Sequence, residues 1–361
     1  MKTALWWIRR DLRLSDNQAL AEALRQAGTV IPVFILDPKL LASDYVGPAR
    51  LAFFYDGLRT LDSKLREQGS RLILREGDPL EVLTTLCLES QAEGIFAEED
   101  YSPYARQRDQ KIALTLPLHL LPGITVFPAQ MLTKANGEPY TVFTPFSRMW
   151  RSLPASGRPL PAPERLPVVP ELPSLEIPGT PNQPLDHSFK AGEEQAQKRL
   201  NDFIDNGIFE YAMLRNRMDL EGTSQLSPYL RLGMLSARQA FWAARQASDS
   251  AKTSKEREGV ETWLTELIWR EFYTSILYYF PFVRGTAFKA DLRSIHWRDD
   301  PDGLAAWQTG KSGYPVVDAA MRQLNTSGWM HNRARMITAS FLTKDLDRKS
   351  TRLNSSHRIR S

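Results

Sequence analysis

Ten prolines fall between Pro154 and Pro184, and no other feature limits the fold as strongly. Proline lacks a backbone N–H and fixes φ, so this density excludes both helix interiors and central strands. We expect an extended connection here. A chain of 361 residues is also too long for one ordinary core. We therefore predict a first domain at residues 1–130, a Pro-rich linker at 131–190 and a second domain at 191–347.

Short apolar runs alternate with helical patterns before the linker. We expect strands at 3–9, 30–36, 71–75, 94–97 and 124–127, and helices at 17–27, 49–68, 79–90 and 105–115. This alternation is typical of an α/β fold with a doubly wound, Rossmann-like parallel sheet. Such sheets bind ligands at the carboxyl ends of their strands, where Arg9, Arg10 and Asp37 would lie. Neither GxGxxG nor GxxxxGK[ST] follows the first run, which disfavours standard dinucleotide and P-loop sites.

Only helical patterns follow the linker, at 193–206, 236–247, 255–279, 302–309, 315–326 and 330–343. We therefore expect an all-α second domain. No run of about 18 apolar residues occurs, so no membrane span is predicted. The single Cys87 fits a reducing cytosol, and we expect a cytoplasmic protein. His331 has no His or Cys partner at metal spacing, so no metal site is expected.

The helical pattern at 261–273 places Glu266, Trp269, Arg270 and Tyr273 on one face. An acid, a flat aromatic ring and a fixed cation suit a planar, polar ligand that carries a phosphate. The alternative is a half-buried helix whose Trp packs in a core and whose Arg pairs with Glu.

Two further stretches could contact such a ligand. The loop at 222–233 offers hydroxyls at Thr223, Ser224 and Ser227 for an anion, although Ser227 could instead cap the following helix. In the stretch 329–336, Trp329, Asn332, Arg333 and Met336 share a helical face, with Arg335 beside them. Such a face can read a base edge and neutralise a phosphate, or it can be a surface helix anchored by its Trp.

Together, and in this order, these stretches resemble the cryptochrome/photolyase family. Residues 5–17 resemble the family's opening strand and loop, 141–146 its link, and 313–322 the segment before its active-site helix. The resemblance covers about residues 1–346. It implies an α/β antenna domain and an all-α domain that holds FAD.

The resemblance implies repair of cyclobutane pyrimidine dimers in ultraviolet-damaged DNA, by electron transfer from photoexcited reduced FAD to a flipped-out dimer. The implied FAD residues are Tyr211, Thr223, Ser224, Gln225, Leu226, Ser227, Trp263 and Arg335. Those implied to line the dimer cavity, and to be catalytic, are Glu266, Trp269, Asn332 and Met336, and those at DNA phosphates are Arg215, Arg270 and Arg333. Trp297 resembles the solvent-side tryptophan of the chain that photoreduces the flavin.

Details within the family favour one branch. Enzymes for (6-4) photoproducts carry His where this chain has Asn332, and DASH cryptochromes carry Gln where it has Met336. We therefore expect a class I cyclobutane pyrimidine dimer (deoxyribodipyrimidine) photolyase that acts as a monomer. Tyr104-Ala105 replaces the Asn-Glu pair of folate-type antenna sites, leaving a deazaflavin, another flavin or no antenna open. Two other functions stay open: a blue-light receptor without repair, and a non-catalytic nucleotide-binding fragment.

The end of the sequence differs from the rest. Residues 348–361 hold five Lys or Arg and no acid, and without them the chain has 41 basic and 42 acidic residues, a net charge of −1. Any DNA affinity must then come from a local patch of arginines. Because the family continues beyond Leu346, we expect these residues to be a non-family tail. We likewise expect the second domain to be truncated, and the chain as given to be inactive and incompletely folded there.

Overall fold

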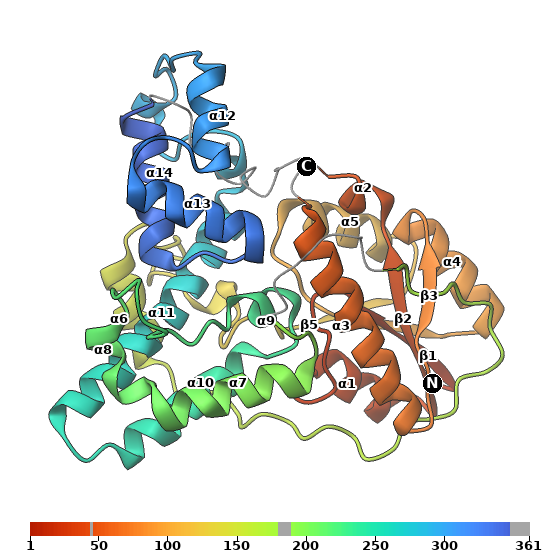
Figure 1. Ribbon diagram of the computed structural model, residues 1–361. Coiled ribbons are helices and arrows are strands. Elements are labelled where there is room, and N and C mark those ends of the chain that lie inside the picture. Colours follow the sequence, from red (N-terminus) through yellow and green to blue (C-terminus); the bar gives the residue numbers. More distant parts are fainter. Residues whose placement is uncertain (44–45, 180–188, 347–361) are drawn as a thin grey trace.

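A computed structural model describes residues 1–43, 46–179 and 189–346, so the expected tail at 348–361 lies outside the described residues (Figure 1). Five parallel strands form one sheet in the order β3-β2-β1-β4-β5. They are β1 (Thr3–Ile8), β2 (Thr29–Leu36), β3 (Ile73–Glu76), β4 (Gly94–Glu98) and β5 (Leu118–Leu121). The expected doubly wound α/β layer is confirmed.

Helices cover both faces of this sheet (Figure 1). Along β1, Trp6 and Ile8 pack on the side of α1 (Gln18–Gln26) and α3 (Pro48–Glu67). Leu5 and Trp7 point to the other face, where α4 (Pro79–Ser90) and α5 (Pro103–Ala113) lie. A short helix, α2 (Pro38–Leu41), follows β2. Burial on both faces explains why the strands read as unbroken apolar runs.

One expected strand is wrong. Residues 124–127 form no strand, and the fifth strand is β5, a few residues earlier. The backbone N–H groups of Val126 and Phe127 donate to the carboxylate of Glu271 instead of to a neighbouring strand. Trp150 Nε1 also donates to this carboxylate, at 2.6 Å. Burial raises the pKa of Glu271 to about 7, although these hydrogen bonds act in the opposite direction.

Among the described residues after β5, all regular structure is helical apart from one isolated β-bridge, as the sequence predicted for the second domain. The α-helices are α6 (Phe143–Ser152), α7 (Glu193–Asn206), α8 (Tyr211–Leu214), α9 (Ser227–Leu232), α10 (Ala237–Ser250), α11 (Ser254–Tyr279), α12 (Pro301–Thr309), α13 (Pro315–Ser327) and α14 (Asn332–Lys344). Short 3₁₀ turns lie at Ala129–Met131, Ile208–Glu210, Pro281–Arg284 and Ala290–Leu292. The long helix α11 packs against α6, α8 and α10 and organises this half. No described helix is long and apolar enough to cross a membrane.

Helix α6 lies inside the region expected to be linker. Its Phe146 and Trp150 are buried, and Phe146 packs edge-on against Phe272 of α11 at 5.3 Å. The described extended part, residues 153–179, runs along the outside of the α/β half (yellow-green in Figure 1). It is attached there, because Leu166 N donates to Gln68 O at 3.0 Å and Val169 and Leu172 are buried.

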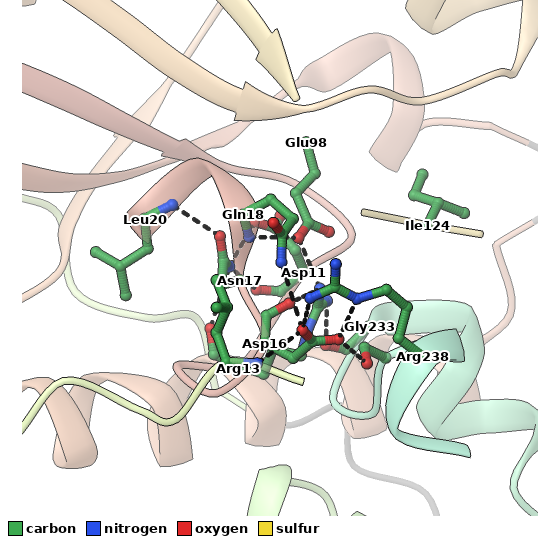
Figure 2. Close-up of polar contacts among 12 residues, drawn as sticks. Asp11, Arg13, Asp16, Asn17, Gln18, Leu20, Glu98, Ile124, Gly233 and Arg238 are labelled. Carbon is green, nitrogen blue, oxygen red and sulfur yellow. Dashed lines mark hydrogen bonds and ion pairs between the residues drawn. The ribbon is translucent and has the colours of Figure 1, made fainter. Parts of the chain in front are cut away.

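The two halves meet through a polar network beside the end of β1 (Figure 2). Arg13 is 1% exposed and donates to Glu98 at 2.6 Å and to the carbonyl oxygens of Asp16 and Gly233 at 2.9 and 3.1 Å. Asp16 in turn accepts from Ser236 at 2.5 Å and from Arg238. Below this network, one hydrophobic core includes residues of both halves, among them Trp6 and Phe272. The sheet and the helices are therefore fixed against each other.

Gly233 makes this approach possible. Its φ is +67°, and a Cβ at this position would lie 1.9 Å from the carbonyl oxygen of Arg10. Only glycine allows both that backbone conformation and that distance. The loop after β1 can therefore lie directly on the end of α9.

Candidate cofactor and DNA site

A cavity of about 510 Å³ lies between the carboxyl edge of the sheet and helices α8, α9, α11 and α14. It brings together most of the residues predicted from the sequence. Its lining includes Tyr211, Arg215, Thr223, Ser224, Leu226, Ser227, Trp263, Glu266, Arg270, Asn332 and Arg333. These residues span more than a hundred positions in the chain, so the fold alone makes them neighbours.

The loop that carries the hydroxyls of Thr223, Ser224 and Ser227, which we call the hydroxyl loop, is held in place by a close backbone approach. A Cβ on Gly222 would lie 2.6 Å from Leu214 Cβ, so the loop closes back onto the end of α8. Trp263 Nε1 on α11 donates to Ser224 Oγ at 3.3 Å. Helix α9 starts at Ser227 without any side-chain capping bond. The capped-turn alternative for Ser227 is therefore wrong.

The α11 face divides between the cavity and the core. Glu266, Arg270 and Tyr273 line the cavity, but Trp269 does not. The Trp269 ring stacks on Phe143 of α6, with 3.5 Å between centroids and 4° between planes. For this one residue the core interpretation fits, because α6, which lies in the region predicted to be linker, supplies the partner ring.

Two arginines lie on the side of the cavity formed by α8 and α14, which we call its mouth. They have different partners. Arg215 Nη1 is 2.8 Å from Glu266 Oε1, and its guanidinium lies 5.8 Å from the ring centroid of Tyr211. Arg333 on α14 donates to Asn216 Oδ1 through Nη2 at 2.7 Å and through Nε at 3.3 Å. Within the described ranges Arg333 makes no ion pair.

The end of the cavity beside the sheet, which we call its inner end, is strongly positive. Arg10, Arg231 and Arg270 meet there, and Asp100 is the one carboxylate in the lining at that end, 3.2 Å from Arg10. The charge of Arg10 lowers the pKa of Arg231 to about 9, and burial lowers that of Arg270 to about 10. Burial alone would raise the pKa of Asp100, but Arg10 lowers it strongly. Guanidinium groups crowded together in this way repel one another, and a bound anion would relieve that repulsion.

Other predicted residues lie outside the cavity lining. Gln225 Oε1 accepts from Arg199 at 2.7 Å, Met336 is 54% exposed beside the mouth, and Arg335 is half-buried with its pKa lowered by burial and by Arg50. Trp297 lines another, mostly apolar cavity of about 530 Å³ with Phe272 and Phe288.

The helix that carries Asn332 starts later than the pattern predicted. Trp329 precedes α14 instead of sharing its face, and His331 is the cap, since its Nδ1 accepts from Arg333 N at 3.0 Å.

Among the charged and amide residues of the lining, sequence patterns missed Asp100, Asn216 and Arg231, whereas Arg10 was expected at this edge of the sheet. The position of Arg10 just after the first strand was a usable signal, because ligands gather at that edge of a sheet. Asn216 and Arg231 sit in local sequence that offers no such signal.

Comparisons with known proteins agree with this architecture. The DNA photolyase family model matches residues 4–164, and the model for the FAD binding domain of DNA photolyase matches residues 263–353. A deoxyribodipyrimidine photo-lyase from Synechococcus is 38% identical, over 95% of this chain and 74% of its own length. The chain thus belongs to the photolyase/cryptochrome family.

Solved structures give the same result. A class III photolyase from Agrobacterium tumefaciens is 31% identical with a TM-score of 0.91, covering 99% of this chain and 76% of its own. An archaeal photolyase from Sulfolobus tokodaii, solved with two FAD molecules, is 28% identical with a TM-score of 0.80, covering 95% and 75%.

Proposed function

We propose that this protein repairs cyclobutane pyrimidine dimers in DNA with the help of light, using FAD held in the cavity between its two halves. The observation that carries the proposal is the cavity itself. It joins a hydroxyl loop, Trp263, a positive inner end and a mouth with Glu266 and Asn332. A dinucleotide fits the first three features, and a nucleic-acid base fits the last.

The inner end suits the diphosphate of FAD. Three guanidinium groups face one carboxylate there, so two negative charges would balance the site. Arg270 donates to the carbonyl oxygen of Ile124 at 2.8 Å and is half-buried. We therefore assign Arg270 to a cofactor phosphate and not, as the resemblance implied, to DNA. Thr223, Ser224 and Ser227 would donate to the same group.

The chemistry that reduced flavin supplies when bound is a light-driven electron transfer to the dimer, reversed once the cyclobutane ring has opened. The protein's own contribution is binding and orientation. As a carboxylate, Glu266 accepts from a pyrimidine N–H, while the Asn332 amide donates to a carbonyl. A damaged, poorly paired base costs least to take out of the helix, which favours lesion over intact DNA.

The apolar wall for the dimer is best assigned to Tyr273. This ring lines the cavity and stacks on Trp269, with 5.6 Å between centroids. Trp269 would then support the wall from behind, and Met336 would contact the lesion at the mouth. The combination of Trp269, Asn332 and Met336 is our reason for proposing class I.

A second chromophore is proposed in the α/β half, for which a flavin-type group is a better candidate than a folate. The Tyr104 hydroxyl donates to Asp37 at the end of β2, where relatives of the folate type would carry an amide. Next to it, Arg106 lies 4.1 Å from the ring centroid of Tyr278 and donates to its carbonyl oxygen at 2.7 Å. A deazaflavin and a second flavin are the candidates, and the absorption spectrum of the released chromophores distinguishes them from each other and from a site without any antenna.

The proposal is tested by illuminating the purified protein with blue light on an oligonucleotide containing one cyclobutane dimer, with dark and (6-4) photoproduct controls. The proposal is supported if light removes the cyclobutane dimer but leaves the (6-4) photoproduct unchanged. Bound flavin without repair favours the receptor function, and absence of flavin favours the non-catalytic fragment. We also propose a cytoplasmic monomer, as the sequence led us to expect; sedimentation velocity tests the monomer.

A further inference from the structure

We propose that Asn216 is a positioning residue, which aims Arg333 at a DNA phosphate beside the cavity without neutralising it. The proposal rests on the function proposed above and adds a residue to which the family resemblance gave no role. Asn216 follows the short helix α8, and Arg333 lies 117 residues later on α14. Both line the cavity.

The contact fixes the direction of the guanidinium. Two of its nitrogens, Nε and Nη2, donate to the single oxygen Asn216 Oδ1 at 3.3 and 2.7 Å. The third, Nη1, lies 3.8 Å from Met336 Sδ. Because the guanidinium is planar, holding one edge sets the direction in which the remaining N–H groups point.

The chemistry of the partner matters as much as the distance. Neighbouring arginines are paired with carboxylates: Arg215 with Glu266 at 2.8 Å, and Arg217 with Asp219 at 2.6 Å. Arg333 is held by a neutral amide and has no ion pair in the described parts of the chain. An amide orients a cation and leaves its charge available, whereas a carboxylate cancels that charge. Of the three, Arg333 is therefore the cation best prepared for a phosphate.

The turn that carries Asn216 also fixes the loop that we assign to FAD. Arg215 N donates to Tyr211 O and Arg217 N to Leu214 O, both at 2.9 Å, which keeps the start of the turn compact. At its other end Gly222 packs against Leu214, directly before Thr223 and Ser224. One short turn thus sets the positions of the hydroxyl loop and of Asn216. Through Asn216 it also sets the DNA-facing cation on α14.

The experiment measures binding in the dark, so it needs no repair. Fluorescence anisotropy of a duplex with one cyclobutane dimer, and of the same duplex undamaged, is recorded over a series of salt concentrations. The full chain is compared with Asn216→Leu, Arg333→Ala and the double variant. Asn201→Leu serves as control, since Asn201 is an exposed amide on α7 that contacts Gln197 and is not in the cavity lining.

We expect Asn216→Leu to weaken lesion binding roughly two- to fivefold, the range for a solvent-exposed charged contact. The salt slope should fall toward that of Arg333→Ala. The double variant should bind no more weakly than Arg333→Ala alone, because Asn216 acts only through Arg333. Asn201→Leu should bind like the parent protein.

Two results overturn the inference: lesion binding by Asn216→Leu equal to that of the parent, or a loss that adds in full to that of Arg333→Ala. If Asn216→Leu has a lower melting temperature, Asn216→Ala replaces it, since truncating an exposed side chain leaves no internal cavity. If the parent protein does not prefer the damaged duplex, the proposed function fails first, and this inference fails with it.

Discussion

Glu271 should make the stability of this protein depend on pH in a way that one substitution removes. The carboxyl group is 3% exposed, accepts hydrogen bonds from Trp150, Val126 and Phe127, and forms no ion pair with any residue that the structure describes. Arg270 is the nearest cation that acts on it, and burial still dominates, raising the pKa of Glu271 to about 7 from an ordinary 4.5. Glu271→Gln replaces the ionisable group by one that mimics its protonated form.

The sign follows from proton linkage. A raised pKa in the folded state means that the folded protein holds the proton more tightly than the unfolded chain does. The resulting stability is present in full below about pH 4.5 and is lost as pH rises through about 7. A difference of 2.5 pKa units corresponds to roughly 3 kcal/mol, which we take as an upper limit for this site.

Urea unfolding of both proteins at several pH values between 4.5 and 8.5 measures this difference. The two should have the same free energy of unfolding near pH 4.5, and the Gln variant should be more stable by up to about 3 kcal/mol at pH 8. Parallel curves for the two proteins across this range would refute the reasoning, because they would show that Glu271 does not change its protonation state on folding.

Three further predictions concern the packing that holds the protein together and the residues of the cavity. Gly233→Ala forces a Cβ to within 1.9 Å of Arg10 O and should cost at least about 1–3 kcal/mol, the range for backbone strain alone, as read from the melting temperature. Trp269→Ala removes the ring stacked on Phe143 and should cost about 3 kcal/mol of unfolding free energy, measured in urea; an unchanged midpoint would contradict the packing role. Arg270→Met should lower bound flavin, measured at 450 nm, while Arg333→Ala should keep the flavin and reduce the salt slope of DNA binding by about one.

The sequence predicted the fold best where patterns were long. Four of the five expected strands and the helices around them were read from unbroken apolar runs and 3.6-residue periods. The prediction failed at 124–127, which is apolar enough for a strand but whose N–H groups are taken by Glu271, more than 140 residues later. Helix α6 was missed although Phe143, Phe146 and Trp150 have helical spacing, because the prolines just after it dominated the interpretation.

The site was predictable only in part, for a related reason. Local spacing indicated that Glu266 and Arg270 share a face, and both line the cavity. The same spacing included Trp269, which instead packs on a helix from another part of the chain. Contacts such as Asn216 with Arg333 join distant segments, and no periodicity within either segment indicates them.

The shared core between the halves has a consequence for the peptide connection between them. Met234 at the end of α9 is fully buried, and the space it occupies is so tight that a Cβ on Gly57 of α3 would lie 2.1 Å from its methyl group. Together with the buried Arg13 network, this packing joins the halves without help from the linker. Tryptic cleavage at the linker residue Arg165 should therefore leave a nicked protein whose two fragments co-elute and refold together. The linker sets the local concentration of one half near the other during folding, and the native contacts hold them afterwards.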